Sequence, residues 1–298
     1  MMQASDTAII LIGGIGAAIS WGISDYFAAH SAKKIGPTLA AAVVNILGAL
    51  LFALIYLGFM WGSFNLELVG VSYSVLSGIV LSIGAVAFFR GLEKGPVSIV
   101  SPLTSLYPLA TTVIAVTIFG AKLSLIQTLG ILLIIGGVLV ASGLLGVKKS
   151  ERKIASGPRY GLLAALFWGI GYSLLAQGIS RIGWETASVI EFVFVAITFL
   201  ILTPFIKGNE VINKTQISAA FKNKFVVSAS VIQLIGVMAL NYGLSKESSS
   251  GAVVTALSAC YPIITVFLAL KHMKEQTAII PLVGAFAGIV GVIILILT

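Results

Sequence analysis

Charged residues are scarce in this chain. They make up 9% of its 298 residues, whereas 58% of the residues are hydrophobic and the mean hydropathy is +1.10. A soluble domain carries roughly 25% charged residues, so this chain cannot cover its surface against water. The composition therefore indicates a protein whose solvent is lipid.

Cysteine and histidine are nearly absent as well. The single cysteine, Cys260, excludes a disulfide within the chain and a metal cluster built on cysteines. The two histidines, His30 and His272, lie near the ends of apolar stretches and form no metal-spaced set. The sequence also shows no Walker motif and no nucleophile–base constellation. We therefore expect no metal, no cofactor and no catalytic residues, and we predict that the protein is not an enzyme.

Long apolar stretches take up most of the sequence. A helix that crosses a membrane needs about 20 apolar residues, and the short connectors between the stretches favour a compact bundle without a soluble domain. Outer-membrane barrels would show alternating segments of about ten residues instead. We therefore predict an all-α integral membrane protein of the cell membrane with ten transmembrane helices. These spans are expected near residues 7–29, 38–59, 69–90, 97–119, 124–146, 159–180, 185–206, 225–245, 250–271 and 277–297.

The ten spans divide into two sets of five with similar sequences. Residues 17–23 (AAISWGI) match residues 164–170 (AALFWGI) 147 positions later, and residues 103–109 (LTSLYPL) match residues 257–263 (LSACYPI) at an offset of 154. Because each set has an odd number of spans, the second must enter the membrane from the opposite side, which predicts an inverted-topology repeat. The predicted parts are a first repeat at 1–146, a basic connector at 147–158 and a second repeat at 159–298.

The net charge of +8 indicates orientation in the membrane rather than binding to nucleic acid. The basic residues are spread over short connectors and form no basic face, so we expect no nucleic-acid partner. The predicted topology places 15 of them on one side of the membrane and only Lys122, Arg181 and Lys246 on the other. The positive-inside rule makes the richer side cytoplasmic and predicts that both termini lie outside.

Both halves share a Trp-Gly pair in the first span, a hydroxyl-rich fourth span with a Tyr-Pro pair, and a glycine-rich fifth span. This arrangement resembles the drug/metabolite transporter superfamily, in its EamA-like branch, over essentially the whole chain. The resemblance implies a secondary transporter of small polar metabolites, with amino acids or related amines as the first expectation and export as the favoured direction. It implies alternating access, with a small-molecule substrate and membrane lipid as partners of a monomer or homodimer. The alternative is a passive channel or a lipid-handling protein. The resemblance also implies that both termini lie inside, opposite to the charge distribution, and we follow the charges.

The two Tyr-Pro segments are the first candidates for a substrate cavity. Their Ser and Thr residues recur at helical spacing and share one face in each half. A helix that lines a cavity can offer a proline-freed carbonyl and hydroxyl groups to a solute; the alternative is close helix packing through small side chains. The predicted cavity residues are Ser101, Thr104, Ser105, Tyr107, Pro108, Thr255, Ser258, Tyr261 and Pro262.

Asp25 and Glu191 are the only acids well inside predicted spans. An ionised carboxylate near the bilayer centre costs at least ~2.5–3.5 kcal/mol, so each should face a cavity or a partner. They could bind a cationic amine or exchange a proton during the transport cycle. For Asp25 the alternative is a structural carboxylate tied to serines or to Lys33 and Lys34.

Aromatic residues complete the predicted site. Trp21 and Trp168 occupy equivalent places in the two repeats and are interpreted as cavity walls or gates, with helix packing as the alternative. We place Tyr172 in the same cavity. Arg90, at the end of the third span, is interpreted as a residue that snorkels to the membrane interface or contacts an anion.

Overall fold

The computed structural model describes residues 4–60, 65–120, 122–141, 157–208, 210, 212–246 and 252–273, together with 283, 284, 287, 290, 291 and 294. Within these residues every regular element is helical, and eight helical segments are long and apolar enough to cross a membrane. The predicted all-α, multi-pass membrane class is therefore confirmed. The tenth predicted span, 277–297, falls almost wholly outside the described residues, as does most of the connector 147–158, so the number ten stays a prediction.

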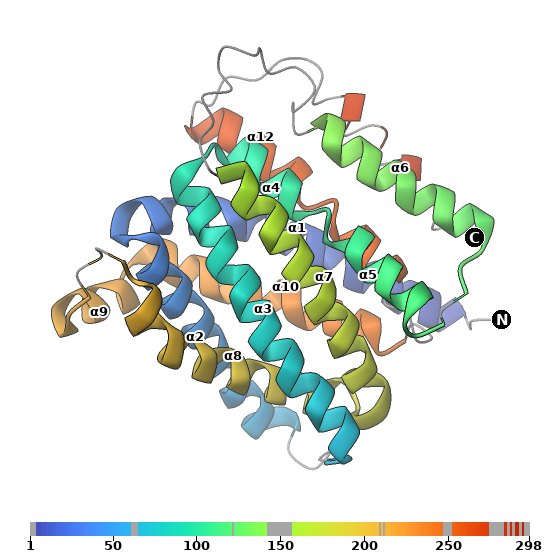
Figure 1. The fold of residues 1–298 in the computed structure, drawn as a ribbon, viewed down its shortest axis with the longest axis horizontal. Coiled ribbons are helices and arrows are strands. Elements are labelled where there is room, and N and C mark those ends of the chain that lie inside the picture. The colour runs from blue at the N-terminus through green and yellow to red at the C-terminus, as the bar shows by residue number, and fades with distance from the viewer. Residues whose placement is uncertain are drawn as a thin grey trace.

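The long helices lie side by side, with α6 at one edge of the bundle and the short α9 at another (Figure 1). The first half contains α1 (Ala4–Ile35), α2 (Pro37–Ile55) with a π-helical end (Tyr56–Met60), α3 (Leu68–Lys94), α4 (Val97–Thr104), α5 (Tyr107–Thr117) and α6 (Leu125–Ala141). The second half contains α7 (Gly157–Ile182), α8 (Trp184–Ile206), α9 (Lys214–Phe221), α10 (Lys224–Leu244), α11 (Ala252–Ser258) and α12 (Pro262–Met273).

Both halves turn from the first helix into the second through one glycine. Gly36 separates α1 from α2 with φ of 87°, and Gly183 separates α7 from α8 with φ of 80°. A side chain is strained at such positive φ values, whereas glycine adopts them freely. The matching Ile-Gly pairs of the two repeats therefore encode the same tight turn.

The predicted spans 97–119 and 250–271 are each built from two helices, with a short break next to the Tyr-Pro pair. The first ends at Thr104 and resumes at Tyr107; the second ends at Ser258 and resumes at Pro262. Pro108 and Pro262 lie in the first turn of the resumed helices. A proline there loses no hydrogen bond because the first N–H groups of a helix have no partner within it. The prolines therefore start new helices instead of kinking one long helix.

The two halves pack by exchanging equivalent contacts. Helix α1 packs along α10, and α7 packs along α3. A Cβ atom built on Gly22 of α1 would lie 2.7 Å from the carbonyl oxygen of Tyr261, and one built on Gly169 of α7 would lie 2.7 Å from the carbonyl oxygen of Tyr107. The two glycines, like the two tyrosines, are the residues that match between the repeats. Each repeat thus holds its partner's broken helix against its own first helix.

The close approach at Gly22 gives a testable prediction for stability. Gly22→Ala is expected to lower the free energy of unfolding by about 1–3 kcal/mol, since the new methyl group overpacks the site; its Cβ would lie 2.6 Å from Cβ of Ile264. Gly16→Ala on the same helix is the matched control, because its Cβ would come no closer than 3.4 Å to Ala239. Thermal unfolding in detergent measures both, and equal melting temperatures would contradict this packing.

Candidate functional site

A cavity lies between the two repeats near the middle of the bundle. It holds about 740 Å³ of space not filled by atoms, its open mouth included. Helices of both halves contribute to the wall. The lining residues are Trp21, Ser24, Asp25 and Ala28 of α1, Asn45 of α2, Leu81, Ala85, Phe88 and Phe89 of α3, Trp168 and Tyr172 of α7, Glu191, Phe192 and Val195 of α8, Gln233 and Val237 of α10, and Tyr261.

Two carboxylates give this cavity its electrostatic character. Asp25 and Glu191 are only 7% and 4% exposed, and among the described residues of the wall no lysine, arginine or histidine accompanies them. Taking an ionised carboxylate out of water is costly unless a partner compensates. Each acid can therefore either hold a proton or bind a solute that brings positive charge.

Asp25 is held by both broken helices. The Ser101 hydroxyl of α4 donates a hydrogen bond of 2.5 Å to Oδ2 of Asp25, and the Thr265 hydroxyl of α12 lies 3.4 Å from the same oxygen. Among the described residues, neither Lys33 nor Lys34 forms an ion pair with it. The carboxylate thus has hydroxyl partners on one side and still lines the cavity.

Glu191 is held by an amide that the sequence prediction missed. The side-chain amide of Asn241 on α10 donates to Oε2 of Glu191 at 3.2 Å and to the Ser188 hydroxyl at 2.9 Å. Asn241 is fully buried. An asparagine inside an apolar span is the signal that could have found it, because a buried amide needs hydrogen-bond partners.

A pair of amides also lies in the cavity wall. Nε2 of Gln233 on α10 donates to Oδ1 of Asn45 on α2 at 3.3 Å, and Nδ2 of Asn45 donates to the carbonyl oxygen of Ala41 at 2.8 Å. The two side chains come from different repeats. They add neutral hydrogen-bonding groups to a wall that the two acids share.

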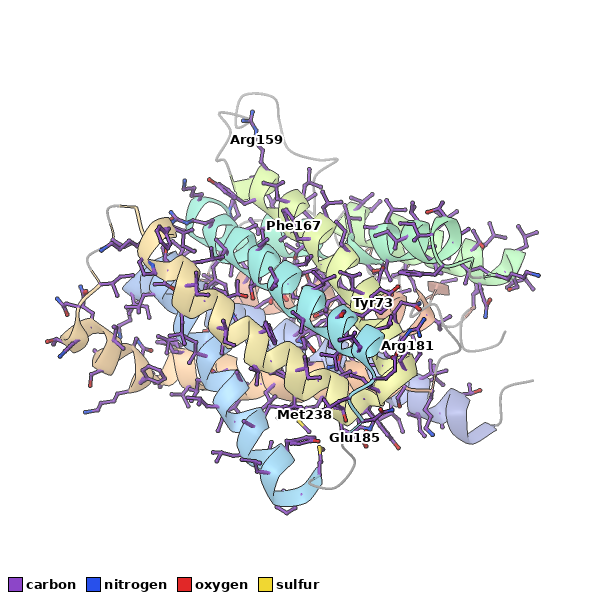
Figure 2. The ribbon with its side chains drawn as sticks, turned by 60° about the horizontal axis from the view of Figure 1, so that its bottom comes forward. Tyr73, Arg159, Phe167, Arg181, Glu185 and Met238 are labelled. Carbon is purple, nitrogen blue, oxygen red and sulfur yellow. The ribbon has the colours of Figure 1, made fainter. Side chains whose placement is uncertain are left out.

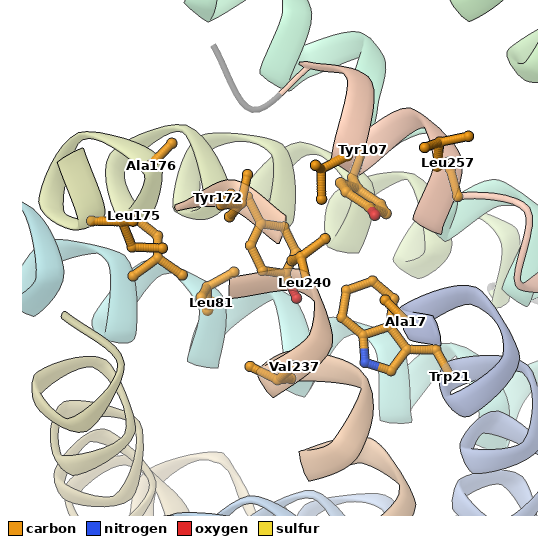
Figure 3. Close-up of a cluster of buried hydrophobic side chains, with 14 of the residues drawn as sticks. Ala17, Trp21, Leu81, Tyr107, Tyr172, Leu175, Ala176, Val237, Leu240 and Leu257 are labelled. Carbon is orange, nitrogen blue, oxygen red and sulfur yellow. The ribbon is translucent and has the colours of Figure 1, made fainter. Parts of the chain in front are cut away.

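Aromatic rings form much of the remaining wall, and Figure 3 shows Trp21 near Tyr107 and Tyr172. Its ring stacks on Tyr172 with 5.9 Å between centroids and meets the rings of Tyr107 and Tyr261 edge-on at 6.3 Å and 6.1 Å. Trp168 lies against Phe88 at 5.2 Å, and its Nε1 donates to the carbonyl oxygen of Leu81 at 3.3 Å. Both tryptophans therefore line the cavity and pack against neighbouring helices.

The other predicted site residues lie behind the wall. Of the residues predicted from the Tyr-Pro segments, only Tyr261 lines the cavity. The predicted residues outside those segments all line it: Trp21, Asp25, Trp168, Tyr172 and Glu191. The others, Ser101, Thr104, Ser105, Tyr107, Pro108, Thr255, Ser258 and Pro262, lie in and around the contact between the two broken helices. Polar groups freed by a helix break inside a membrane must find partners within the protein. These hydroxyls serve that purpose in the structure.

Arg90, which the sequence suggests either snorkels or contacts an anion, is bound to groups of the protein that include the carboxylate of Glu210. Its Nη2 donates to the Thr38 hydroxyl at 3.1 Å and to the carbonyl oxygen of Ile206, and it lies 4.0 Å from Oε1 of Glu210. Glu210 also accepts bonds from the backbone N–H groups of Thr38 and Leu39, at the positive N-terminus of α2. The cluster joins α2 and α3 of the first repeat to the end of α8 in the second.

The opposite end of α3 carries a second ion pair between the repeats. Nη1 of Arg181, at the end of α7, lies 4.0 Å from Oε1 of Glu67, which caps the N-terminus of α3. The Arg181 guanidinium also lies over the ring of Tyr73, and Figure 2 shows it at the far end of α7 from Arg159. Both side chains of the pair are more than 40% exposed, so this contact is looser than the Arg90 cluster.

Comparisons with known proteins agree with a transporter. The EamA-like transporter family matches the chain at residues 8–143 and again at residues 155–297. An uncharacterized transporter of Archaeoglobus fulgidus is 27% identical over 215 residues, which are 72% of this chain and 72% of that protein. An uncharacterized protein of Methanocaldococcus jannaschii is 34% identical over 140 residues, which are 46% of this chain and 97% of that shorter protein. A crystal structure with 15% identity has a TM-score of 0.69 and covers 98% of this chain and 96% of its own, which supports the fold.

Proposed function

Because the chain belongs to the EamA-like transporter family, we propose that this membrane transporter carries small polar metabolites with an amine group, amino acids among them. The observation that carries this proposal is the pair of acidic side chains in the cavity wall. Two buried acids, Asp25 and Glu191, face a space whose described wall has no basic side chain. A protonated amine would supply the missing positive charge.

The aromatic wall suits the same class of solute. Trp21 and Tyr172 are stacked next to the two acids. A cation close to the face of an aromatic ring is attracted by the negative charge of the ring face. The amides of Asn45 and Gln233 could bind a second polar group of the substrate, such as the carboxylate of an amino acid.

We further propose that the transporter works by alternating access between two inverted repeats. The contacts of Gly22 with Tyr261 and of Gly169 with Tyr107 support this, because each half makes the same contact with the other half. In such transporters the halves rock around a site at their interface. We place the protein in the cell membrane with both termini outside, and we favour export as the direction.

Binding of amines in detergent tests the substrate class. A ligand that binds only the folded protein raises its apparent stability by about 2.7 kcal/mol at a hundred times its Kd. We expect amines and amino acids to raise the melting temperature, whereas matched alcohols and carboxylic acids without an amine leave it unchanged. Stabilisation by carboxylic acids alone would overturn the proposed substrate class.

A further inference from the structure

Two tyrosine hydroxyls join the broken helices of the two repeats. The hydroxyl of Tyr107 is hydrogen-bonded to the Ser258 hydroxyl and donates to the carbonyl oxygen of Thr255 at 3.1 Å. We call this set the Tyr107 clasp. It connects the break between α4 and α5 to α11, and all three residues are buried.

The equivalent contact is present with the roles of the two repeats exchanged. The hydroxyl of Tyr261 is hydrogen-bonded to the Thr104 hydroxyl and donates to the carbonyl oxygen of Ser101 at 3.1 Å. We call this set the Tyr261 clasp. Each of its residues is the counterpart of one in the Tyr107 clasp at the offset of 154 that relates the two Tyr-Pro segments. Two equivalent clasps therefore hold the two breaks together.

The two clasps differ in their connection to the cavity. Ser101, whose carbonyl oxygen belongs to the Tyr261 clasp, donates its hydroxyl to Asp25 at 2.5 Å, and Asp25 lines the cavity. Thr265, one helical turn after Tyr261, approaches the same carboxylate oxygen. In the second repeat the counterpart of Asp25 is Tyr172, 147 residues later. The acid that touches a clasp is thus present in one repeat and replaced in the other.

We propose that Asp25 couples occupancy of the cavity to the Tyr261 clasp. This inference rests on the proposed function, in which a cationic amine binds in the cavity. A hydrogen bond to a carboxylate is roughly twice as strong as one between neutral groups, so Asp25 holds Ser101 and the last turn of α4 firmly against α1. An amine that shares the carboxylate weakens this bond and lets the Ser101 carbonyl oxygen move away from Tyr261. Ser101 is a positioning residue in this scheme, while the Tyr107 clasp stays closed.

The only cysteine of the chain, Cys260, can be used to monitor this clasp without introducing another cysteine. Cys260 directly precedes Tyr261 in the break between α11 and α12 and is partly buried. Its rate of alkylation by N-ethylmaleimide in detergent measures how often the break opens. Asp25→Asn should raise this rate about ten-fold, the ratio that corresponds to the difference between a charged and a neutral hydrogen bond. Glu191→Gln, the same change at the other cavity acid, should leave the rate within about two-fold of the parent, because Glu191 is bonded to Asn241 and Ser188 lies beside it.

A second variant separates this coupling from damage to the fold. Ser101→Ala removes the other partner of the same hydrogen bond and should raise the Cys260 rate to a similar extent. If Asp25 acts through Ser101, the double variant should react no faster than either single variant. The coupling would be overturned if the increase in the Cys260 alkylation rate in the double variant were the product of the two single increases. It would also be overturned if Asp25→Asn and the parent protein reacted at equal rates. These measurements need no ligand, so their outcome does not depend on which substrate the protein carries. A failure of amines to bind would refute the proposed substrate class, and the effect of Asp25 on the Cys260 alkylation rate could still be measured.

Discussion

Transport of a cationic amine is expected to fall at least a hundred-fold when Asp25 and Glu191 are neutralised together, as Asp25→Asn and Glu191→Gln. Hydrogen bonds to charged groups contribute about 1.5–3 kcal/mol each, which corresponds to roughly ten- to 150-fold for each single variant. The amide side chains keep the shape of the acids, so the cavity should retain its form. Uptake of a radiolabelled amine into proteoliposomes measures the loss.

Glu185→Gln is the matched control for this experiment. Glu185 lies in the first turn of α8, the helix that carries Glu191, and is not part of the cavity wall. The same chemical change there removes one acid from the chain without altering the site. Transport should therefore persist in this variant. Full amine transport in the double variant would show that the two acids are structural.

The second large effect concerns stability. Tyr107→Ala and Tyr261→Ala should each lower the free energy of unfolding by about 3–5 kcal/mol, as truncation of a large buried aromatic side chain does. The two side chains are 0% and 2% exposed, and their hydroxyls are bonded across the two repeats. Tyr242→Ala is the control, because Tyr242 is 40% exposed and its truncation opens little space. Melting temperatures in detergent give the comparison, and three equal values would contradict the buried clasps.

The milder Tyr→Phe variants separate packing from substrate contact. The sequence predicts that both tyrosines touch the substrate, whereas the structure places Tyr261 in the cavity wall and Tyr107 behind it. Loss of the Tyr261 hydroxyl should lower amine affinity by about two- to twelve-fold, the equivalent of one hydrogen bond of 0.5–1.5 kcal/mol. Loss of the Tyr107 hydroxyl should leave the affinity unchanged. Equal losses at the two positions would favour the symmetric prediction.

The membrane class and the location of most spans follow from the sequence. Helix length in a bilayer depends on a local property, the length of an apolar run, and the eight candidate spans among the described residues are of this kind. The Trp-Gly pairs also point to the packing of first helices, because a small residue allows close approach. The two acids could be singled out for a similar reason: a carboxylate in an apolar span is costly wherever it lies.

The details of the site depend on contacts that a local pattern does not contain. The hydroxyl face around Pro108 is consistent with a cavity wall or with helix packing, and only the position of the other repeat decides between them. Arg90 and Glu210 are 120 residues apart in sequence, and neither lies in a motif that predicts their pairing. The helix breaks depend on partners too, because the carbonyl oxygens of Ser101 and Thr255 each accept a hydrogen bond from the tyrosine of the other repeat.

Counterflow in proteoliposomes tests the central claim, that this chain is a carrier with one site reached alternately from the two sides. Vesicles are loaded with an unlabelled amine that stabilises the protein, and entry of the same radiolabelled amine is followed without any ion gradient. A carrier's site returns to the outside faster when it is loaded with substrate than when it is empty. We therefore expect the internal amine to accelerate entry and to produce a transient accumulation of label. Entry at the same rate into loaded and empty vesicles would contradict alternating access and show that the cavity belongs to a passive channel.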